Sequence, residues 1–356
     1  MKKVLKILGK ILLCIILLAA IGITVLTITE YKPAAKETVI ASHEAEAKFE
    51  TGKTLSILSW NCGYGALGDN ADFFMDGGKA VNPSSKARVR TNLESIRDEI
   101  AKQKTDFVLL QEVDINSGRS YGTDERKILK EGMPGAEEAF AYNFKALYVP
   151  YPIPPIGHVE SGLYTLSSVP VRSAERISLP CPFKWPIRTV HLKRCLLVSH
   201  IPLEGTDKEL VLINLHLEAY DDGAGKEAQT QQLISVMEEE AERGNYVIAG
   251  GDFNQLFSNV DSSAYPVYEG KWQPGRIEAE AFGDSFTLLM DPSAPTCRSL
   301  DRKYEGEDAD TFQFYMIDGF ILSNNVQADS IKTLSLGFTA TDHNPVRLEC
   351  TLLPAN

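Results

Sequence analysis

IAGGDFNQ, residues 248–255, joins a short apolar run to two glycines and then to an acid and an amide. The apolar run is typical of a buried strand. Asp252 and Asn254, which follow it, allow two readings. They form a turn, because Gly, Asp and Asn all tolerate turn conformations, or they are polar groups that a strand end delivers to a functional site, because loops often carry function.

Several other segments repeat this pattern, in which an apolar run ends in, or encloses, acids, amides or histidine. They are LSILSWN with Asn61, DFVLLQEVD with Glu112, LVLINLHLEAY with His216, FYMIDGFILS with Asp318, and TATDHNPVRLEC with Asp342 and His343. Each segment alone is ordinary, but the repetition favours the second reading.

Helix-like stretches lie between these segments. Residues 84–104 begin with serines suited to capping and carry apolar residues at helical spacing, and residues 225–243 show similar spacing. Residues 161–167, 195–201 and 208–215 alternate or run apolar, as strands do. We therefore expect strands packed in a core, helices outside them and polar residues at the strand ends.

Some of the polar residues suit a metal site and a general base. Asn61, Glu112 and Asp342 offer hard oxygen ligands, which suit Mg²⁺ or Mn²⁺ better than zinc. His343 can act as a general base if a carboxylate fixes its tautomer, and Asp318 is a candidate for that carboxylate.

Three further residues complete the set. Asp252 and Asn254 can position an attacking water and a charged oxygen, and His216 can donate a hydrogen bond to a phosphate. A metal, an oriented base and hydrogen-bond donors together indicate hydrolysis of a phosphate ester.

The segments resemble, in family order, motifs of the endonuclease/exonuclease/phosphatase superfamily, whose members include deoxyribonucleases, neutral sphingomyelinases and deadenylases. The matching motifs are SWN, QEVD, NLHL, GDFN, MIDGFILS and TDHNPV, and they span residues 55–347. The resemblance implies an α/β fold, a four-layer sandwich of two packed, mainly antiparallel β-sheets flanked by helices. It also implies a site at one edge of that sandwich.

The resemblance implies metal ligands as well. Glu112 is then the main ligand, with Asn61 and Asp342 beside it. The cofactor is Mg²⁺ or Mn²⁺, with Ca²⁺ as a further candidate.

The remaining matched residues are expected to be catalytic. By resemblance, Asp252 orients or deprotonates the nucleophilic water, Asn254 and His216 bind the scissile phosphate, and Asp318 holds His343. Whether Asp252 or His343 takes the proton stays open.

Arg119 is the one substrate-binding candidate outside these motifs. It lies in SGRSYG, after the strand of Glu112, and a guanidinium there can bind a phosphate through two hydrogen bonds. An exposed, solvated arginine is the alternative.

The N-terminus has the pattern of a membrane anchor. Residues 1–10 carry four lysines and no acid, and residues 11–29 carry no charge. An apolar helix of roughly 20 residues spans a bilayer, and the basic end stays in the cytoplasm. We expect a single-pass cell-membrane protein with an uncleaved anchor, in preference to a cleaved signal peptide. Residues 30–53 read as a linker, and residues 54–356 as one extracytoplasmic catalytic domain.

Charge and cysteine content narrow the function classes. The formal net charge of −12 disfavours sequence-independent binding of nucleic acid. Six cysteines are too few for a disulfide scaffold and show no C-x-x-C zinc spacing. Cys181 and Cys195 either pair or stay as free thiols.

Three functions remain open. The first is a phosphodiesterase that acts outside the membrane on a lipid head group or another small phosphodiester. The second is a surface nuclease that degrades DNA or RNA. The third is an inactive binding protein of the same fold, which the complete motif set disfavours. The sequence indicates no protein partner. The stretch LYVPYPIPPIGHV, residues 147–159, reads as part of the substrate rim or as a rigid loop.

Overall fold

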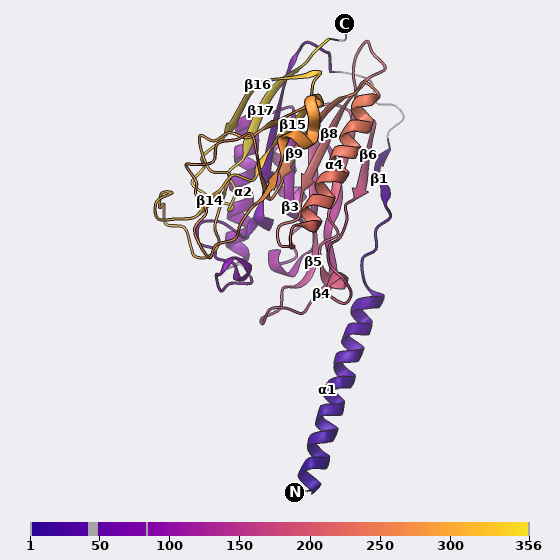
Figure 1. The fold of residues 1–356 in the computed structure, drawn as a ribbon, viewed down its shortest axis with the longest axis vertical. Helices are drawn as coiled ribbons and strands as arrows, with labels where there is room; N and C mark the ends of the chain where they lie inside the picture. Colours follow the sequence, from indigo (N-terminus) through magenta and orange to yellow (C-terminus); the bar gives the residue numbers. More distant parts are fainter. Residues whose placement is uncertain (1, 42–48, 83–84, 355–356) are drawn as a thin grey trace.

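Two large β-sheets pack face to face in this computed structural model, which describes residues 2–41, 49–82 and 85–354 (Figure 1). The seven-stranded sheet has the order β1 (Lys36–Ala41), β6 (Ser173–Ser178), β7 (Cys195–Pro202), β8 (Glu209–His216), β9 (Tyr246–Asp252), β15 (Asp318–Ser323), β12 (Phe286–Leu289). The six-stranded sheet has the order β16 (Val326–Thr333), β17 (Val346–Leu352), β2 (Thr54–Asn61), β3 (Phe107–Asp114), β5 (Gly157–Ser167), β4 (Glu137–Val149).

Four short strands form two further pairs outside these sheets. They are β10 (Gln255–Phe257) with β11 (Gly275–Ile277), and β13 (Cys297–Arg298) with β14 (Phe314–Tyr315). The helices are α1 (Lys2–Ile28), α2 (Lys86–Gln103), α3 (Glu125–Leu129) and α4 (Ala224–Glu242). The short 3₁₀ segments are η1 (Gly63–Gly65), η2 (Phe74–Asp76), η3 (Gly118–Ser120), η4 (Lys130–Gly132), η5 (Ile187–Val190) and η6 (Ala279–Ser285).

The core has the layers of a four-layer sandwich. Apolar residues from the inner faces of both sheets form one buried cluster, which includes Ile57, Leu109, Leu212 and Ile248. A second cluster lies between the seven-stranded sheet and α4, and a third between the six-stranded sheet and α2. The predicted sandwich is therefore confirmed. In the described residues each large sheet is mixed, with one parallel pair, β8–β9 or β2–β3, among antiparallel neighbours.

Helix α2 forms where its spacing predicted it. The Ser85 hydroxyl accepts a hydrogen bond from the backbone N–H of Arg88 and so caps the first turn. Its buried face carries Val89, Leu93, Ile96 and Ile100, which follow the helical period. The helix ends at Lys104, whose left-handed φ of 51° breaks the helical backbone.

The predicted linker, residues 30–53, contains a strand. Residues 36–41 form β1, which pairs antiparallel with β6 at the edge of the seven-stranded sheet. Val39 and Ile40 pack against the core between the sheets. The predicted linker therefore includes an ordered strand, which completes the free edge of the sheet. Residues 42–48 of the predicted linker lie outside the described residues.

The six cysteines are free thiols, so Cys181 and Cys195 do not pair. Cys195 is buried in the core between the sheets, and Cys181 is exposed.

Helix α1 begins at Lys2, well before the predicted anchor of residues 11–29, and contains 27 residues. At 1.5 Å per residue this is about 40 Å, longer than the roughly 30 Å hydrocarbon core of a bilayer. Lys2–Ile28 has no buried residue, and by length and composition it can cross a membrane or serve as a signal sequence.

Candidate active site

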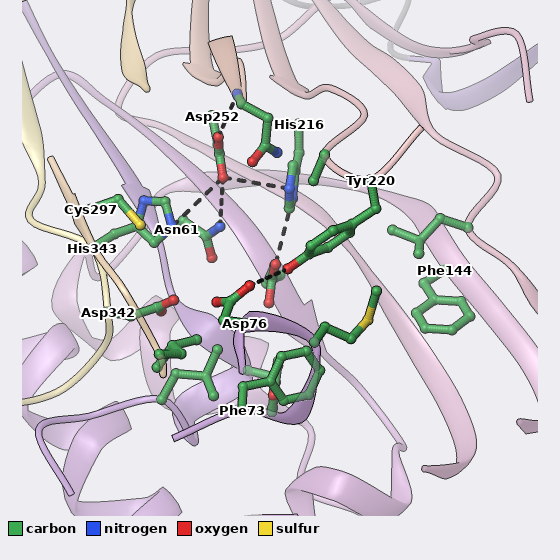
Figure 2. Close-up of a pocket in the computed structure, with 18 of the residues that line it drawn as sticks. Asn61, Phe73, Asp76, Phe144, His216, Tyr220, Asp252, Cys297, Asp342 and His343 are labelled. Atoms are coloured by element: carbon green, nitrogen blue, oxygen red, sulfur yellow. Dashed lines mark hydrogen bonds and ion pairs between the residues drawn. The ribbon is translucent and has the colours of Figure 1, made fainter. Parts of the chain in front are cut away.

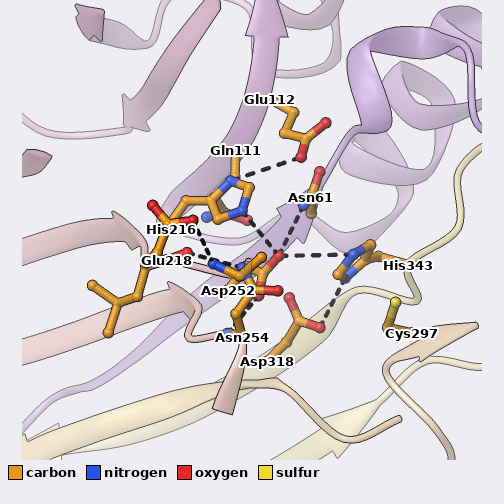
Figure 3. A network of polar contacts seen from close by, with 12 residues as sticks. Asn61, Gln111, Glu112, His216, Glu218, Asp252, Asn254, Cys297, Asp318 and His343 are labelled. Carbon is orange, nitrogen blue, oxygen red and sulfur yellow. Dashed lines mark hydrogen bonds and ion pairs between the residues drawn. The ribbon is translucent and has the colours of Figure 1, made fainter. Parts of the chain in front are cut away.

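The strand ends that carry the predicted residues meet, and Figure 3 shows their side chains close together. His216 ends β8 and Asp252 ends β9, and the two are register partners. Asp318 begins β15 and is also a register partner of Asp252. From the other sheet, β2 ends at Asn61 and β3 carries Glu112. The parallel strand pairs β8–β9 and β2–β3 therefore bring polar groups from both sheets together at the carboxyl ends of their strands.

The stretch IAGGDFNQ is both a strand end and a turn. β9 is buried throughout, so a core strand delivers Asp252. The chain then turns, because Asn254 has a φ of 52° and donates its backbone N–H to Asp252 Oδ1 at 2.9 Å. Gly251 has a φ of +149°, and a Cβ there would lie 2.0 Å from the carbonyl oxygen of Leu215. Glycine is therefore required for β9 to pass this close to β8.

Asp252 lies at the centre of the polar network (Figure 3). Its Oδ2 accepts a hydrogen bond from Asn61 Nδ2 at 3.0 Å and lies 3.5 Å from His216 Nε2 and 3.7 Å from His343 Nε2. Burial, reinforced by the negative charge of Asp318, raises the pKa of Asp252 to about 7. A carboxylate with such a pKa exchanges protons near neutral pH, as a general base must.

His343 is held by Asp318. Its Nδ1 lies 2.9 Å from Asp318 Oδ2, so the ring donates to the carboxylate and directs Nε2 towards Asp252. Thr296 Oγ1 accepts the backbone N–H groups of Ile317 and Asp318 and fixes the start of β15. Burial alone would lower the pKa of His343, but the charge of Asp318 raises it well above its ordinary value. The predicted contact between Asp318 and His343 is therefore present.

His216 differs from His343 in its surroundings. Its pKa is lowered well below the ordinary value by burial and by the positive charges of Arg194, His343 and Arg119. Its Nδ1 has no hydrogen-bond partner among the described residues and lies 3.9 Å from Glu112 Oε1. A neutral imidazole with an unpaired nitrogen on the cavity wall can donate to, or accept from, a bound group.

The three predicted metal ligands line the same cavity and are held in different ways. Glu112 has a φ of 55° at an irregularity in the β3–β5 pairing, and within the part of the chain that the structure describes no hydrogen bond reaches its carboxylate. Asn61 Oδ1 accepts the backbone N–H of Gly63 at 3.0 Å. Asp342 Oδ1 lies 3.2 Å from the hydroxyl of Thr341.

These donors fit a hard divalent cation. Burial raises the pKa of Glu112, and the negative charge of Asp342 adds to the rise. Two acids that repel each other, one of them without a protein donor, are stabilised by a bound cation. Carboxylate and amide oxygens suit Mg²⁺, Mn²⁺ and Ca²⁺ alike.

Two other groups have ligand atoms within 4.8 Å of one another, and both include His343. One consists of Asp252, Asp318 and His343, and the other of Cys297, Asp342 and His343. The hydrogen bond between His343 and Asp318 occupies one ring nitrogen in each group. Glu112, Asn61 and Asp342 stay the predicted ligands.

Arg119 is not the exposed, solvated arginine of the alternative reading. Its guanidinium donates to both carboxylate oxygens of Asp114, at 3.1 and 3.0 Å, and lies 3.7 Å above the Tyr64 ring. It still lines the cavity. Asn254 is also partly engaged, since its Nδ2 donates to the carbonyl of Leu217 at 2.9 Å. Binding of the substrate phosphate by Arg119 and Asn254 remains a prediction.

The structure adds cavity residues that sequence reasoning missed (Figure 2). Tyr220 donates its hydroxyl to Asp76 Oδ1 at 3.1 Å, and burial raises the pKa of Asp76 to about 6. Arg194 pairs with Glu218 at 3.2 Å and donates to the carbonyl of His216. Glu218 and Tyr220 follow the motif NLHL within the segment LVLINLHLEAY, but none of these residues belongs to a family motif.

The cavity has a volume of about 170 Å³, and the polar residues described above are part of its lining. Much of its wall is aromatic or aliphatic and comes from several loops and strands; these wall residues include Tyr64, Leu67, Phe73, Phe144, Ile156, Leu192, Tyr220, Trp272, Leu300 and Tyr315. Ile156 belongs to the stretch predicted as a possible rim, so this part of 147–159 does border the cavity.

Solved structures similar to this chain have the same fold. A Beutenbergia cavernae endonuclease/exonuclease/phosphatase is 16% identical, with coverage of 85% of this chain and 72% of that chain and a TM-score of 0.57. A Bacteroides thetaiotaomicron family protein is 18% identical, with coverage of 85% and 99% and a TM-score of 0.52. The human nocturnin catalytic domain is 14% identical, with coverage of 84% and 94% and a TM-score of 0.50.

No curated protein sequence matches the chain significantly. Residues 58–302, however, match the endonuclease/exonuclease/phosphatase family. This match covers more than half of the sequence and includes Asn61, Glu112, His216 and Asp252. The chain therefore belongs to the endonuclease/exonuclease/phosphatase family.

Proposed function

We propose that the protein is a divalent-metal-dependent phosphodiesterase that uses an activated water for in-line attack on a small phosphodiester. Family members are hydrolases of phosphoester bonds and are typically metal-dependent. The observation that carries the proposal is the arrangement of Asp318, His343 and Asp252, in which a carboxylate orients an imidazole whose other nitrogen faces a second carboxylate.

In this proposal the chain's own groups position and deprotonate the water. Asp252, held by the amide of Asn61, orients the water, and either Asp252 or the Asp318-oriented His343 accepts its proton. His343 can accept it only in its neutral form, which the raised pKa of its ring disfavours. His216 donates to the phosphate as charge develops there. A divalent cation held by Glu112, Asn61 and Asp342 would stabilise negative charge on a phosphate oxygen.

We further propose that α1 anchors the protein in the cell membrane. The four lysines of residues 1–10 place that end in the cytoplasm by the positive-inside rule, and so place the catalytic domain outside. The alternative is a cleaved signal sequence, which passes the same length and composition test.

A surface nuclease is the second candidate. It shares the reaction chemistry, but the net charge of −12 repels a polyanion on average. The aromatic wall of the cavity could stack on a base, as proteins that bind single strands do. An inactive binding protein is less favoured, because the chain contains every motif residue to which the family resemblance assigns a role.

The direct test is a panel of phosphoesters presented to the full-length protein in detergent with Mg²⁺, Mn²⁺ or Ca²⁺. The panel contains bis(p-nitrophenyl) phosphate, lipids with phosphodiester head groups, and single- and double-stranded DNA and RNA. The proposal expects metal-dependent turnover of small or lipid diesters. Faster cleavage of nucleic acid would favour the nuclease, and metal binding without any turnover would favour the binding protein.

A further inference from the structure

The polypeptide enters the catalytic domain at the same end of the sandwich as the active site. Lys36, at the start of β1, is the register partner of Ile177 near the end of β6. The next residue, Ser178, pairs with the first residue of β7, and that end of β7 lies beside the end of β8 at His216. Figure 1 shows α1 leaving the domain at the end opposite the C-terminus. A helix in a bilayer therefore places the active-site end towards the lipid.

The connection between α1 and β1 is short and held at several points. Residues 29–35 span at most about 25 Å when extended. Trp185 Nε1 donates to Thr27 Oγ1 at 3.1 Å, close to the end of α1. Glu30 lies 3.2 Å from Lys193 Nζ and 3.4 Å from Arg188 Nε. These contacts limit how far the domain can turn away from the axis of α1.

Two loops at this end carry exposed apolar side chains. The β4–β5 connection carries Tyr151, which is 69% exposed, and Ile153, which is 93% exposed. The loop around η5 carries Trp185 at 55% and Ile187 at 59%. A soluble surface seldom gathers exposed apolar groups of this size without an interaction partner.

The two loops form one surface. Phe144 and Val159 of the β4–β5 hairpin form a buried cluster, against which Val190 and Leu192 pack from the end of η5 and the segment that follows it. We call the exposed apolar residues of these two loops the docking surface, and they are Tyr151, Ile153, Trp185 and Ile187.

The charge pattern of the docking surface suits a lipid interface. Residues 146–157, which include the β4–β5 connection, contain no charged residue. On the η5 loop, Lys184 and Arg188 flank Trp185 and are exposed. Tryptophan and tyrosine concentrate at the level of the lipid head groups, and nearby lysine and arginine pair with lipid phosphates.

We propose that the docking surface rests on the bilayer that α1 crosses and holds the mouth of the active-site cavity against the lipid head groups. Phe144, Ile156 and Leu192 line the cavity and belong to the same two segments, so the cavity and the docking surface are continuous. The substrate class is then a membrane lipid with a phosphodiester head group. This substrate assignment rests on the proposed phosphodiesterase function, whereas the docking itself does not.

The docking is tested by depth-dependent fluorescence quenching of the full-length protein in phosphatidylcholine vesicles, with and without spin-labelled lipid. In a Trp185→Phe background, Ile153→Trp places an indole on the docking surface. The matched control, Thr206→Trp, places one on the turn after β7, at the opposite end of the sandwich, where Pro202 pairs with Glu209. The native residues Trp60, which is buried, and Trp272, which is partly buried, contribute the same fluorescence in both variants.

If the surface docks, spin-labelled lipid causes a loss of fluorescence in the Ile153→Trp variant beyond that of the background, and no added loss in the Thr206→Trp variant. Native Trp185 is then also quenched, so that wild type loses more fluorescence than Trp185→Phe. Equal quenching of the two introduced tryptophans would overturn the docking.

The quenching needs no turnover, so it separates the two proposals. Quenching of the Ile153→Trp variant without turnover of any phosphoester would leave the docking standing and remove the phosphodiesterase. Turnover of a soluble diester without this quenching would leave the phosphodiesterase standing and remove the docking. Quenching with faster cleavage of nucleic acid than of any lipid would overturn the lipid as substrate.

Discussion

Nδ1 of His343 lies 2.9 Å from Oδ2 of Asp318, and Nε2 of the same ring faces Asp252 Oδ2 across 3.7 Å. The hydrogen bond to Asp318 fixes one nitrogen as a donor, so the opposite nitrogen is directed into the cavity. This relationship distinguishes a site that can move a proton from a cavity that only binds phosphate.

We predict that His343→Ala lowers kcat on a phosphodiester by on the order of 10² to 10⁴-fold, because it removes proton transfer and charge stabilisation together. Asp318→Asn should lower kcat as well, because an amide can stabilise the wrong tautomer and cannot stabilise the imidazolium. Binding of a non-hydrolysable analogue should change much less. Steady-state kinetics and analogue binding measure the two effects separately.

His200→Ala is the matched control for these variants. His200 Nδ1 also bonds to a carboxylate, Glu209 Oε2 at 3.1 Å, but it lies on β7 and pairs there with Ser173 of β6, away from the cavity. The kcat of His200→Ala should equal that of wild type. An equal loss of kcat in His200→Ala and His343→Ala would mean that the loss reflects folding.

Glu112→Gln should keep the fold and lose most metal-dependent activity, because the substitution removes a charged group from a proposed metal site with few carboxylates. The measurement is activity against Mg²⁺ concentration for wild type, Glu112→Gln and the exposed control Glu239→Gln on α4. If Glu112→Gln is as active as wild type at both limiting and saturating Mg²⁺, Glu112 is not a ligand.

Divalent ions should also stabilise the fold without any substrate. A ligand at 100 times its Kd contributes about 2.7 kcal/mol to the free energy of unfolding. We expect Mg²⁺ or Mn²⁺ to raise the Tm of wild type after treatment with a chelator, and to raise that of Glu112→Gln much less. An equal rise in both proteins would place the ion at another site.

Arg119→Lys should raise KM for a phosphodiester by roughly tenfold, the factor that corresponds to about 1.4 kcal/mol. Lysine keeps the charge but cannot reproduce the planar guanidinium that now binds Asp114 and stacks on Tyr64. Steady-state kinetics with bis(p-nitrophenyl) phosphate give the value. An unchanged KM and kcat would show that Arg119 only supports the loop structure.

The stability of the fold should depend on pH through His191. Burial, reinforced by the positive charges of Arg194 and Lys193, lowers its pKa to about 4, whereas the unfolded value is about 6.5. Between these values the unfolded state binds more protons, so the free energy of unfolding rises with pH through that window.

His191→Phe removes this titration and keeps an aromatic ring opposite Phe183, on which His191 now stacks at 3.6 Å between ring centroids. The free energy of unfolding of the variant minus that of wild type should be about 2 kcal/mol larger at pH 5 than at pH 8. Chemical denaturation at the two pH values checks this. A stability difference that does not change with pH would show that His191 is not held neutral.

Much of the fold was predictable because its signals are local. The helix of residues 84–104 follows from capping serines and apolar spacing, and α2 occupies Lys86–Gln103. The strand β1 was not predictable, because Val39 and Ile40 give too weak a pattern within a polar segment. Its order comes from pairing with β6, which lies more than 130 residues away in the sequence.

The residues of the site also fall into those that the sequence predicts and those that it does not. Motif residues such as His343 and Asp318 were identified because they sit beside apolar strands, and the structure brings them into contact. Asp76 and Tyr220 were missed because a hydrogen bond between two loops leaves no periodic pattern in either loop. The pairing of Arg119 with Asp114 was missed for a different reason, since a sequence does not show which way a loop side chain turns.

The most direct test of the account is metal-dependent turnover by the full-length protein in vesicles that contain a phosphodiester lipid, followed by phosphorus NMR. We expect hydrolysis of the head-group phosphodiester with Mg²⁺ or Mn²⁺, none after chelation, and a loss of activity on the order of 10² to 10⁴-fold in His343→Ala. If wild type binds the metal and a non-hydrolysable diester yet hydrolyses neither this lipid nor any soluble phosphoester, the protein is not the enzyme described above.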